Sequence, residues 1–199
     1  MDAAGPLRGT VALVLGASGI VGGGVADGLI KAGARVLAPC RSESSKAKMM
    51  EHLEHSHSPL LEAPVVDYSS ETGLAGLVEY VQNHAGLQGH VDHIFSCQGG
   101  SVPKGPLSAV AEAELEAAVR DRIVSQALSA RYLAPLVKPG GDGCYLVATG
   151  RLGEGCTAPE WGIYTIVNAA VYGVVSAIRS EYSDIRVQEV RCVEAARAY

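Results

Sequence analysis

The sequence predicts a doubly wound α/β fold, the Rossmann fold, with helices on both faces of a parallel sheet of about six strands. Short apolar runs alternate with amphipathic stretches along all 199 residues, and such alternation indicates successive right-handed βαβ units. Aromatic residues make up only 5% of the chain, so Val, Leu, Ile and Ala must build the core, as in buried parallel strands. Glycines that open the first helix select the dinucleotide-binding version, with strand order 3-2-1-4-5-6 in one domain over residues 1–199.

Each expected strand is a short apolar run, and each expected helix has apolar or capping residues at helical spacing. The expected strands span residues 10–16, 35–39, 63–67, 90–96, 143–149 and 185–190. The first expected helix starts at residue 20, and the others span residues 42–53, 69–84, 111–137 and 164–182. Gly33 ends the first helix, serines cap the second and third, and Pro135 bends or ends the fourth.

The stretch LVLGASGIVGGG raises the question of whether a nucleotide phosphate binds here. Gly16, Gly19 and Gly22 form the pattern G-x-x-G-x-x-G between the first strand and the first helix. The first glycine permits a tight turn, the second lets a pyrophosphate approach the backbone, and the third lets helix and strand pack closely. Free N–H groups at the helix start attract phosphates, and we count Ser18, as a hydroxyl donor, and Ile20 with this site. The alternative is a turn with a purely structural role.

The end of the second strand indicates which dinucleotide binds. NAD requires an Asp or Glu about twenty residues beyond the glycines for its ribose 2′-hydroxyl, and the segment APCRSESS has no acid at the strand tip. Arg41 can instead pair with a 2′-phosphate, and Ser42 can donate a further hydrogen bond. The sequence therefore favours NADP(H) over NAD(H), the alternative being a solvated arginine at the start of a loop.

Nearly the whole chain resembles the short-chain dehydrogenases/reductases. VVDYSS is similar to the family's segment after the third strand, and the resemblance implies that Asp67 faces the adenine. VDHIFSCQGG resembles the fourth strand and the turn after it, where Gln98 replaces an alanine and Gly99 is kept; both are expected to border the cofactor. Residues 122–135 and 185–190 resemble the family's fourth helix and sixth strand.

The resemblance implies an active site of Asn, Ser, Tyr and Lys, which this chain matches only in part. Tyr164 stands where a tyrosine exchanges a proton with the substrate oxygen. The lysine position, one helical turn later, holds Asn168, which can hydrogen-bond a ribose hydroxyl but carries no charge. The serine position falls at Thr149 or Gly150, and Thr149 offers a hydroxyl. The asparagine position holds Arg122, which either restores positive charge near Tyr164 or, as we expect, is a solvated cation.

Three functions are compatible with these residues. The first, which we prefer, is an NADP(H)-dependent reductase of a carbonyl or similar group, with Tyr164 as proton donor and Thr149 as ligand of the substrate oxygen. The second is a catalytically inactive relative that binds NADP(H) for structural, sensing or assembly roles, and Asn168 favours it. The third is a protein-interaction module that has lost the nucleotide. RCVEAARAY follows the sixth strand where the family has a lid and a seventh strand, so we expect a substrate side open to water.

Composition argues against several other classes. A net charge of −5 disfavours a general nucleic-acid binder, and the sequence has neither an uninterrupted apolar stretch of membrane-span length nor signal-peptide features. We therefore expect a cytoplasmic protein whose partner is a small-molecule substrate. The five cysteines are scattered, which indicates reduced thiols. His52, His55 and His57 lie among Glu, Ser and Lys, which indicates a solvated helix end rather than a metal site.

A homodimer through the two long helices is also expected. In the family these helices often pack against their copies, and small or apolar residues in both stretches permit such packing here. Some of these residues must face the sheet instead. The residues are Ala127, Leu128, Ala130, Ala169, Ala170 and Val174.

Overall fold

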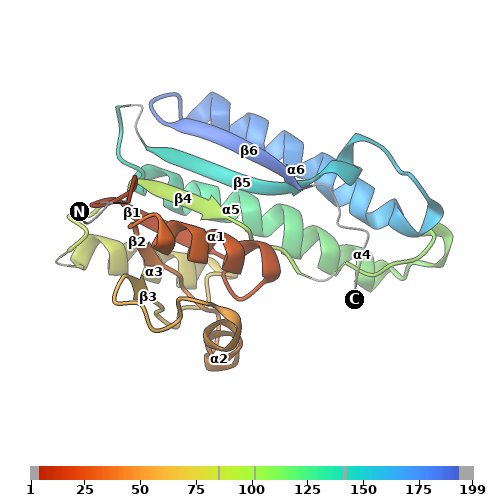
Figure 1. Cartoon of the computed structure of the whole chain (residues 1–199). Helices are drawn as coiled ribbons and strands as arrows, with labels where there is room; N and C mark the ends of the chain where they lie inside the picture. The colour runs from red at the N-terminus through yellow and green to blue at the C-terminus, as the bar shows by residue number, and fades with distance from the viewer. Residues whose placement is uncertain (1–4, 85, 101, 141–142, 193–199) are drawn as a thin grey trace.

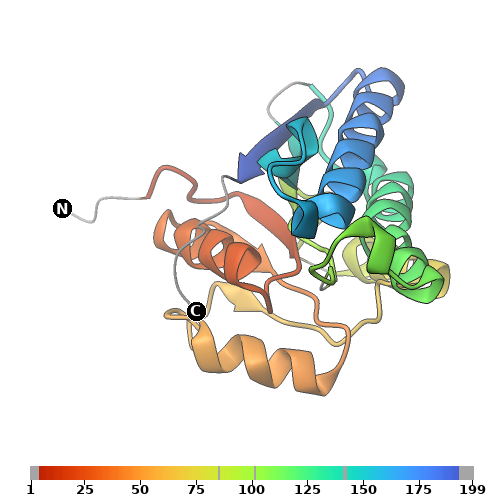
Figure 2. The ribbon, with the colours of Figure 1, turned by 90° about the vertical axis from the view of Figure 1, so that its right-hand side faces the viewer.

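Figures 1 and 2 show a computed structural model of the chain, which describes residues 5–84, 86–100, 102–140 and 143–192. Its centre is a six-stranded sheet in the order β3-β2-β1-β4-β5-β6, with every neighbouring pair parallel. This confirms the predicted Rossmann fold and its strand order. Residues 193–199 lie outside the described residues, so the expectation for the segment after the sixth strand stays a prediction.

The strands are β1 (Val11–Leu15), β2 (Arg35–Leu37), β3 (Leu61–Glu62), β4 (His93–Ser96), β5 (Cys144–Gly150) and β6 (Arg186–Cys192). The helices are α1 (Ile20–Lys31), α2 (Glu43–His52), α3 (Glu71–Asn83), α4 (Glu112–Val119), α5 (Ser125–Leu133) and α6 (Gly162–Glu181). A π-helical turn, η2 (Arg120–Val124), joins α4 to α5. Short 3₁₀ turns are η1 (Leu107–Ala109), η3 (Ala134–Leu136), η4 (Arg151–Glu154) and η5 (Pro159–Trp161).

The alternation of side chains along β1 divides the core into two layers. Leu13 and Leu15 pack with the apolar faces of α3, α5 and α6. Ala12 and Val14 point to the other face, where α1 and α2 pack. Figure 2 shows α1 and α2 apart from α5 and α6, with the strands between them. The helix layers on both faces hold the sheet in place, and with it the carboxyl ends of the strands, where ligands bind in this fold.

Several predicted boundaries have visible local causes. Gly33 adopts a φ of +91° just after α1, a conformation that favours glycine at a helix end. Ser42 and Ser70 cap α2 and α3, each accepting a backbone N–H with its side chain. The long helix expected over 111–137 is interrupted by the π-helical turn, and Pro135 lies in the 3₁₀ turn that ends it.

The third strand was predicted in the wrong place. The expected strand covered residues 63–67, whereas β3 is Leu61–Glu62. Within the expected range, Val65 makes only an isolated parallel bridge with Cys40. Pro64 has no N–H for a regular ladder, and its carbonyl accepts the Cys40 N–H at 2.9 Å.

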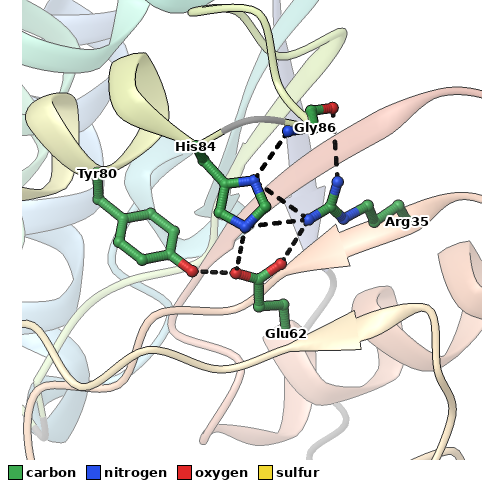
Figure 3. A network of polar contacts seen from close by, with 5 residues as sticks. All are labelled: Arg35, Glu62, Tyr80, His84 and Gly86. Carbon is green, nitrogen blue, oxygen red and sulfur yellow. Dashed lines mark hydrogen bonds and ion pairs between the residues drawn. The ribbon is translucent and has the colours of Figure 1, made fainter.

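A polar cluster joins the sheet to α3 near the start of β2 (Figure 3). Glu62 accepts a hydrogen bond from Arg35 at 2.7 Å and another from the Tyr80 hydroxyl, and His84 Nε2 lies 3.0 Å from the same carboxylate. Arg35 also reaches the Gly86 carbonyl at 3.5 Å. Burial alone would raise the pKa of Glu62, but the hydrogen bonds from Tyr80 and Arg35 and the charge of His84 outweigh it and lower that pKa. Burial and the Glu62 carboxylate raise the pKa of Tyr80 to about 12.

Among the described residues, one helical segment, Pro159–Glu181, is long and apolar enough to cross a membrane by length and composition alone, with a mean hydropathy of 1.5. Its apolar residues are interrupted by polar ones such as Asn168 and Arg179. The segment consists of η5 and α6, and α6 packs against β5 and β6.

Candidate functional site

A cavity of about 870 Å³ lies at the carboxyl ends of β1, β4, β5 and β6. Its wall includes the start of α1, the turn after β4, the end of β5, η4 and the first part of α6. The predicted site residues that line it are Gly19, Ile20, Gly22, Gln98, Gly99, Thr149, Tyr164 and Asn168. Gly16, Ser18, Arg41, Ser42 and Asp67 are not among its lining residues.

The glycine turn has the close contacts that its sequence predicts. Gly16 has a φ of +81°, and a Cβ there would lie 2.6 Å from the carbonyl oxygen of Cys97. A Cβ at Gly22 would lie 2.2 Å from the carbonyl oxygen of Gly16. A larger residue at Gly16 would therefore push the turn away from the segment that follows β4. A larger residue at Gly22 would push α1 away from the turn. Gly19, at the N-cap of α1, has no side chain to cover the first N–H groups, which leaves the helix start open to an anion.

A tyrosine that the sequence did not single out supports this turn. The Gly16 N–H donates to the Tyr68 hydroxyl oxygen at 3.1 Å, across 52 residues of chain. Tyr68 is buried, and burial raises the pKa of its hydroxyl. The sequence around Tyr68 does not indicate this contact, because only the fold brings the segment after β3 beside the glycine turn.

Arg41, Ser42 and Asp67 follow β2 and β3, to one side of the cavity. Hydrogen bonds from Ser69 lower the pKa of Asp67, and the nearby charge of Arg41 lowers it further. Arg41 is exposed, so its guanidinium is accessible to a phosphate. Ser42 accepts the Ser45 N–H at 3.1 Å as the cap of α2. Its hydroxyl also lies within hydrogen-bond distance of the hydroxyls of Ser44, at 2.9 Å, and Ser45, at 2.7 Å.

The predicted catalytic residues converge on the cavity from β5 and α6. Tyr164 is half-buried, while Thr149 and Asn168 are buried. The Thr149 hydroxyl makes only a long contact, 3.5 Å, with the Val190 carbonyl, so it can still bind a ligand oxygen. A Cβ at Gly150 would lie 2.7 Å from Asn168 Nδ2, so the glycine makes room for the carboxamide that replaces the expected lysine.

An aromatic pair flanks the proton-donor position. The Trp161 ring meets the Tyr164 ring edge-on, with ring centroids 5.5 Å apart, and Lys104 Nζ lies 4.5 Å above the Trp161 ring. The Gly105 N–H donates to the Glu160 carbonyl at 3.1 Å, which ties the loop after β4 to η5. These residues pack beside Tyr164 outside the cavity wall, and their spacing in the sequence gave no indication of it.

Gln98 turns its side chain toward α5. Its Nε2 donates to the Ser125 carbonyl at 3.0 Å and to Ser129 Oγ at 2.6 Å. The backbone carbonyl of Gln98 accepts a hydrogen bond from Gln126 Nε2, and Gln126 Oε1 accepts one from the Ser96 hydroxyl. This buried network fixes the turn after β4, and the predicted cofactor contact of Gln98 stays a prediction.

Arg122 was expected to be a solvated cation, and that prediction is wrong. It lines the cavity, and its Nε atom is fully buried without a hydrogen-bond partner in the described part of the chain. A Cβ at Gly99 would lie 2.7 Å from this Nε, so the glycine provides the space. Burial lowers the pKa of Arg122, and the nearby Tyr164 opposes that effect. The other interpretation, positive charge near Tyr164, is therefore the one that the structure supports.

The remaining groups that could react have ordinary roles. Burial, and to a smaller extent Cys192, raise the pKa of Cys97 in the cavity wall to about 12, so it is a thiol rather than a nucleophilic thiolate. His52 contacts the Lys48 carbonyl, and His55 contacts Asp27. No group of three or more His, Cys, Asp or Glu side chains that could hold a metal ion occurs among the described residues.

The site fits the dinucleotide that the sequence predicts. The backbone cradle at Gly16 and Gly22 is closed to a Cβ but open at the start of α1, as a pyrophosphate requires. Arg41 lies near Asp67 to one side of the cavity, and the Asn168 carboxamide, which can hydrogen-bond a hydroxyl, is in the cavity wall. The donors present are thus those that hold phosphates and ribose hydroxyls.

Comparison with known proteins gives both sequence and structural matches. A family model described as short chain dehydrogenase matches residues 10–196. A curated 2,3-dihydroxy-2,3-dihydro-p-cumate dehydrogenase of Pseudomonas putida is 33% identical over 99 residues, which is 49% of this chain and 36% of that protein. The match to this curated relative thus spans about a third of its length.

Two solved structures illustrate the shared fold. A short-chain type dehydrogenase/reductase from Mycobacterium ulcerans matches with a TM-score of 0.81 and 23% identity over 94% of this chain and 68% of that one. A structure from Shigella flexneri 2a strain 301, complexed with NADP, matches with a TM-score of 0.80 and 19% identity over 94% of this chain and 78% of that one.

Proposed function

Because this chain belongs to the short chain dehydrogenase family, we propose that it is an NADP(H)-dependent oxidoreductase that reduces the carbonyl group of a small molecule. The observation that carries the proposal is that Tyr164 lines the same cavity as the glycine turn. The exposed Arg41 beside Asp67 supports NADP(H) over NAD(H). The NADP complex of the Shigella flexneri relative agrees with that choice.

Each residue then has a defined task. NADPH bound in this cavity would supply the hydride. Tyr164 donates a proton to the substrate oxygen as that oxygen gains negative charge, and the Thr149 hydroxyl hydrogen-bonds the same oxygen. Asn168 holds a ribose hydroxyl, and the positive charge near Tyr164 comes from Arg122 rather than from a lysine.

Turnover tests this assignment directly. The purified full chain is mixed with NADPH and a panel of aldehydes and ketones, and the loss of NADPH absorbance is followed. We expect reduction, and we expect Tyr164→Phe to slow it by about 10²- to 10⁴-fold, the usual value of acid–base assistance. Tyr172→Phe is the control, because its hydroxyl binds the Gly150 carbonyl and its ring is not in the cavity wall. Equal rates for wild type and Tyr164→Phe would contradict the role of Tyr164.

A second candidate function is NADP(H) binding without catalysis. It is favoured by Asn168 at the lysine position and by the fact that no lysine is among the described residues of the cavity wall. Calorimetry that shows NADPH binding, together with no turnover on any carbonyl compound, would support this candidate against the reductase.

A further inference from the structure

Arg122 presents an unused positive group inside the proposed active site. It enters the cavity from η2, between α4 and α5. Its Nε is buried and has no hydrogen-bond partner in the described ranges, and its Nη2 reaches the Gly100 carbonyl only at 3.4 Å. A buried donor without an acceptor is unfavourable, so the folded chain retains a guanidinium whose Nε lacks an acceptor.

The charges around Arg122 do not provide that acceptor. Asp121 is exposed, and its carboxylate is directed to Gly100, where a Cβ would lie 2.0 Å from Oδ2. No carboxylate lies within ion-pair distance of Arg122 among the residues that the structure describes. Several other arginines do form ion pairs: Arg35 with Glu62, Arg131 with Glu71 and Arg191 with Glu154.

We propose that Arg122 binds a carboxylate of the substrate, so that the pocket takes an oxo acid, a carbonyl compound that carries a carboxylate. This inference rests on the proposed function, because it concerns the substrate of the same site. A guanidinium matches a carboxylate through two parallel hydrogen bonds, which fixes orientation as well as affinity. Tyr164 and Arg122 line the same cavity, so one molecule can place its carbonyl at Tyr164 and its carboxylate at Arg122.

The cofactor phosphates are the other source of an anion, and the geometry favours the substrate. The predicted phosphate contacts are at the start of α1, from Gly19 to Gly22. Arg122 lies instead against Gly99 and Gly100, beside the proton donor.

Calorimetry with benzoate and benzamide tests the proposal without turnover. The two probes have the same ring and nearly the same shape, but only benzoate is charged. With saturating NADP⁺ present, we expect wild type to bind benzoate more tightly than benzamide. We expect Arg122→Gln to weaken benzoate binding by roughly tenfold or more and to change the benzamide and NADP⁺ affinities by less than about twofold.

Two variants make the result specific. Arg122→Lys keeps the charge but not the fork, so it should retain part of the benzoate affinity that Arg122→Gln loses. Arg151→Gln is the matched control, because Arg151 lines the same cavity but is 67% exposed and lies 3.5 Å from Glu154. We expect this control to change benzoate affinity by less than about twofold.

Three results would overturn the inference. The first is that wild type and Arg122→Gln bind benzoate with the same affinity. The second is that wild type binds benzoate no more tightly than benzamide. The third is that Arg122→Gln loses as much affinity for NADP⁺ as for benzoate. The last would assign Arg122 to the cofactor. None of them depends on turnover, so a failure of the reductase proposal is seen separately, as NADPH that no carbonyl compound oxidises.

Discussion

Single residues decide which cofactor the proposed site prefers. Arg41 is exposed beside Asp67, and we propose that it makes a charge-assisted contact with the 2′-phosphate of NADP(H). We expect Arg41→Gln to weaken NADPH binding by roughly tenfold. The substitution removes a charge-assisted contact, and the exposure of Arg41 keeps the loss smaller than for a buried ion pair. NADH, which has no 2′-phosphate, should bind nearly as before. Calorimetry with both cofactors measures this.

The control for this prediction is Arg8→Gln, an exposed arginine that is not in the cavity wall. It should leave both affinities unchanged. If Arg41→Gln weakened NADPH and NADH equally, the discrimination between the two cofactors would have to come from other residues.

For single residues, the sequence predicted which residues line the cavity better than it predicted how buried each one is. Tyr164 and Asn168 were found in the cavity wall because one helical turn separates them and the family pattern marks the helix. Arg122 was misjudged because an arginine in a helix usually faces water. Its burial depends on space at Gly99 and on the π-helical turn, and neither can be recognised from the residues around Arg122 alone. In the structure Arg122 lies one turn from both Ala118 and Gln126, which are buried, but only the fold reveals their burial.

At the scale of elements, the polar cluster between the sheet and α3 makes stability depend on pH. The pKa of Glu62 in the folded protein lies below its ordinary value of 4.5. The carboxylate therefore stabilises the fold fully above that value, and this contribution is lost as the pH falls through the folded pKa. Glu62 and Arg35 are about a third exposed, so solvent screening limits the charge contribution to about 1 kcal/mol.

We expect Glu62→Gln to lower the free energy of unfolding in urea by about 1 kcal/mol at pH 7. Its difference from wild type should shrink as the pH is lowered below 4.5. Other carboxylates are common to both proteins, so their titration cancels in this difference. Glu79→Gln, at an exposed position of α3, is the control and should show no such trend. A Glu62→Gln deficit that stays constant with pH would mean that packing, not charge, causes it.

Elements whose signals are local were predicted well. Helix starts followed the capping serines, and the end of α1 followed Gly33. The third strand was misplaced because Val65 and Val66 have high β propensity, while the pairing that forms depends on the partner strand β2 and on the missing N–H of Pro64. Pairing between strands is a property of two segments, and one segment alone does not specify it.

At the scale of the whole molecule, α6 carries an exposed face that a second copy could cover. Ile166, Ala169, Gly173 and Ala177 recur at helical spacing and are all exposed, and α5 packs beside α6 on the same side of the sheet (Figure 2). Of the residues expected in a dimer interface, Ala130 is in the core instead, and Leu128 and Val174 are partly buried against it. The apolar composition that would let this helix cross a membrane also suits a helix–helix contact between two copies.

We therefore propose a symmetric dimer through α5 and α6. Light scattering at micromolar concentration should give twice the chain mass of 20.6 kDa for wild type. Ala169→Glu should shift the protein toward the monomer, because a buried charge at the interface has no partner. Ala75→Glu, on an exposed position of α3, should remain dimeric. A monomeric wild type would contradict the proposal.

The hydrogen bond between Gly16 and Tyr68 has a consequence for motion. The Gly16 amide is held by a side chain that follows the third strand, so it can exchange its hydrogen with solvent only when the first turn and the segment after β3 move apart. A ligand that spans both segments would oppose this separation. Deuterium uptake at this one amide would then report how often the two segments separate, and how strongly a bound ligand keeps them together.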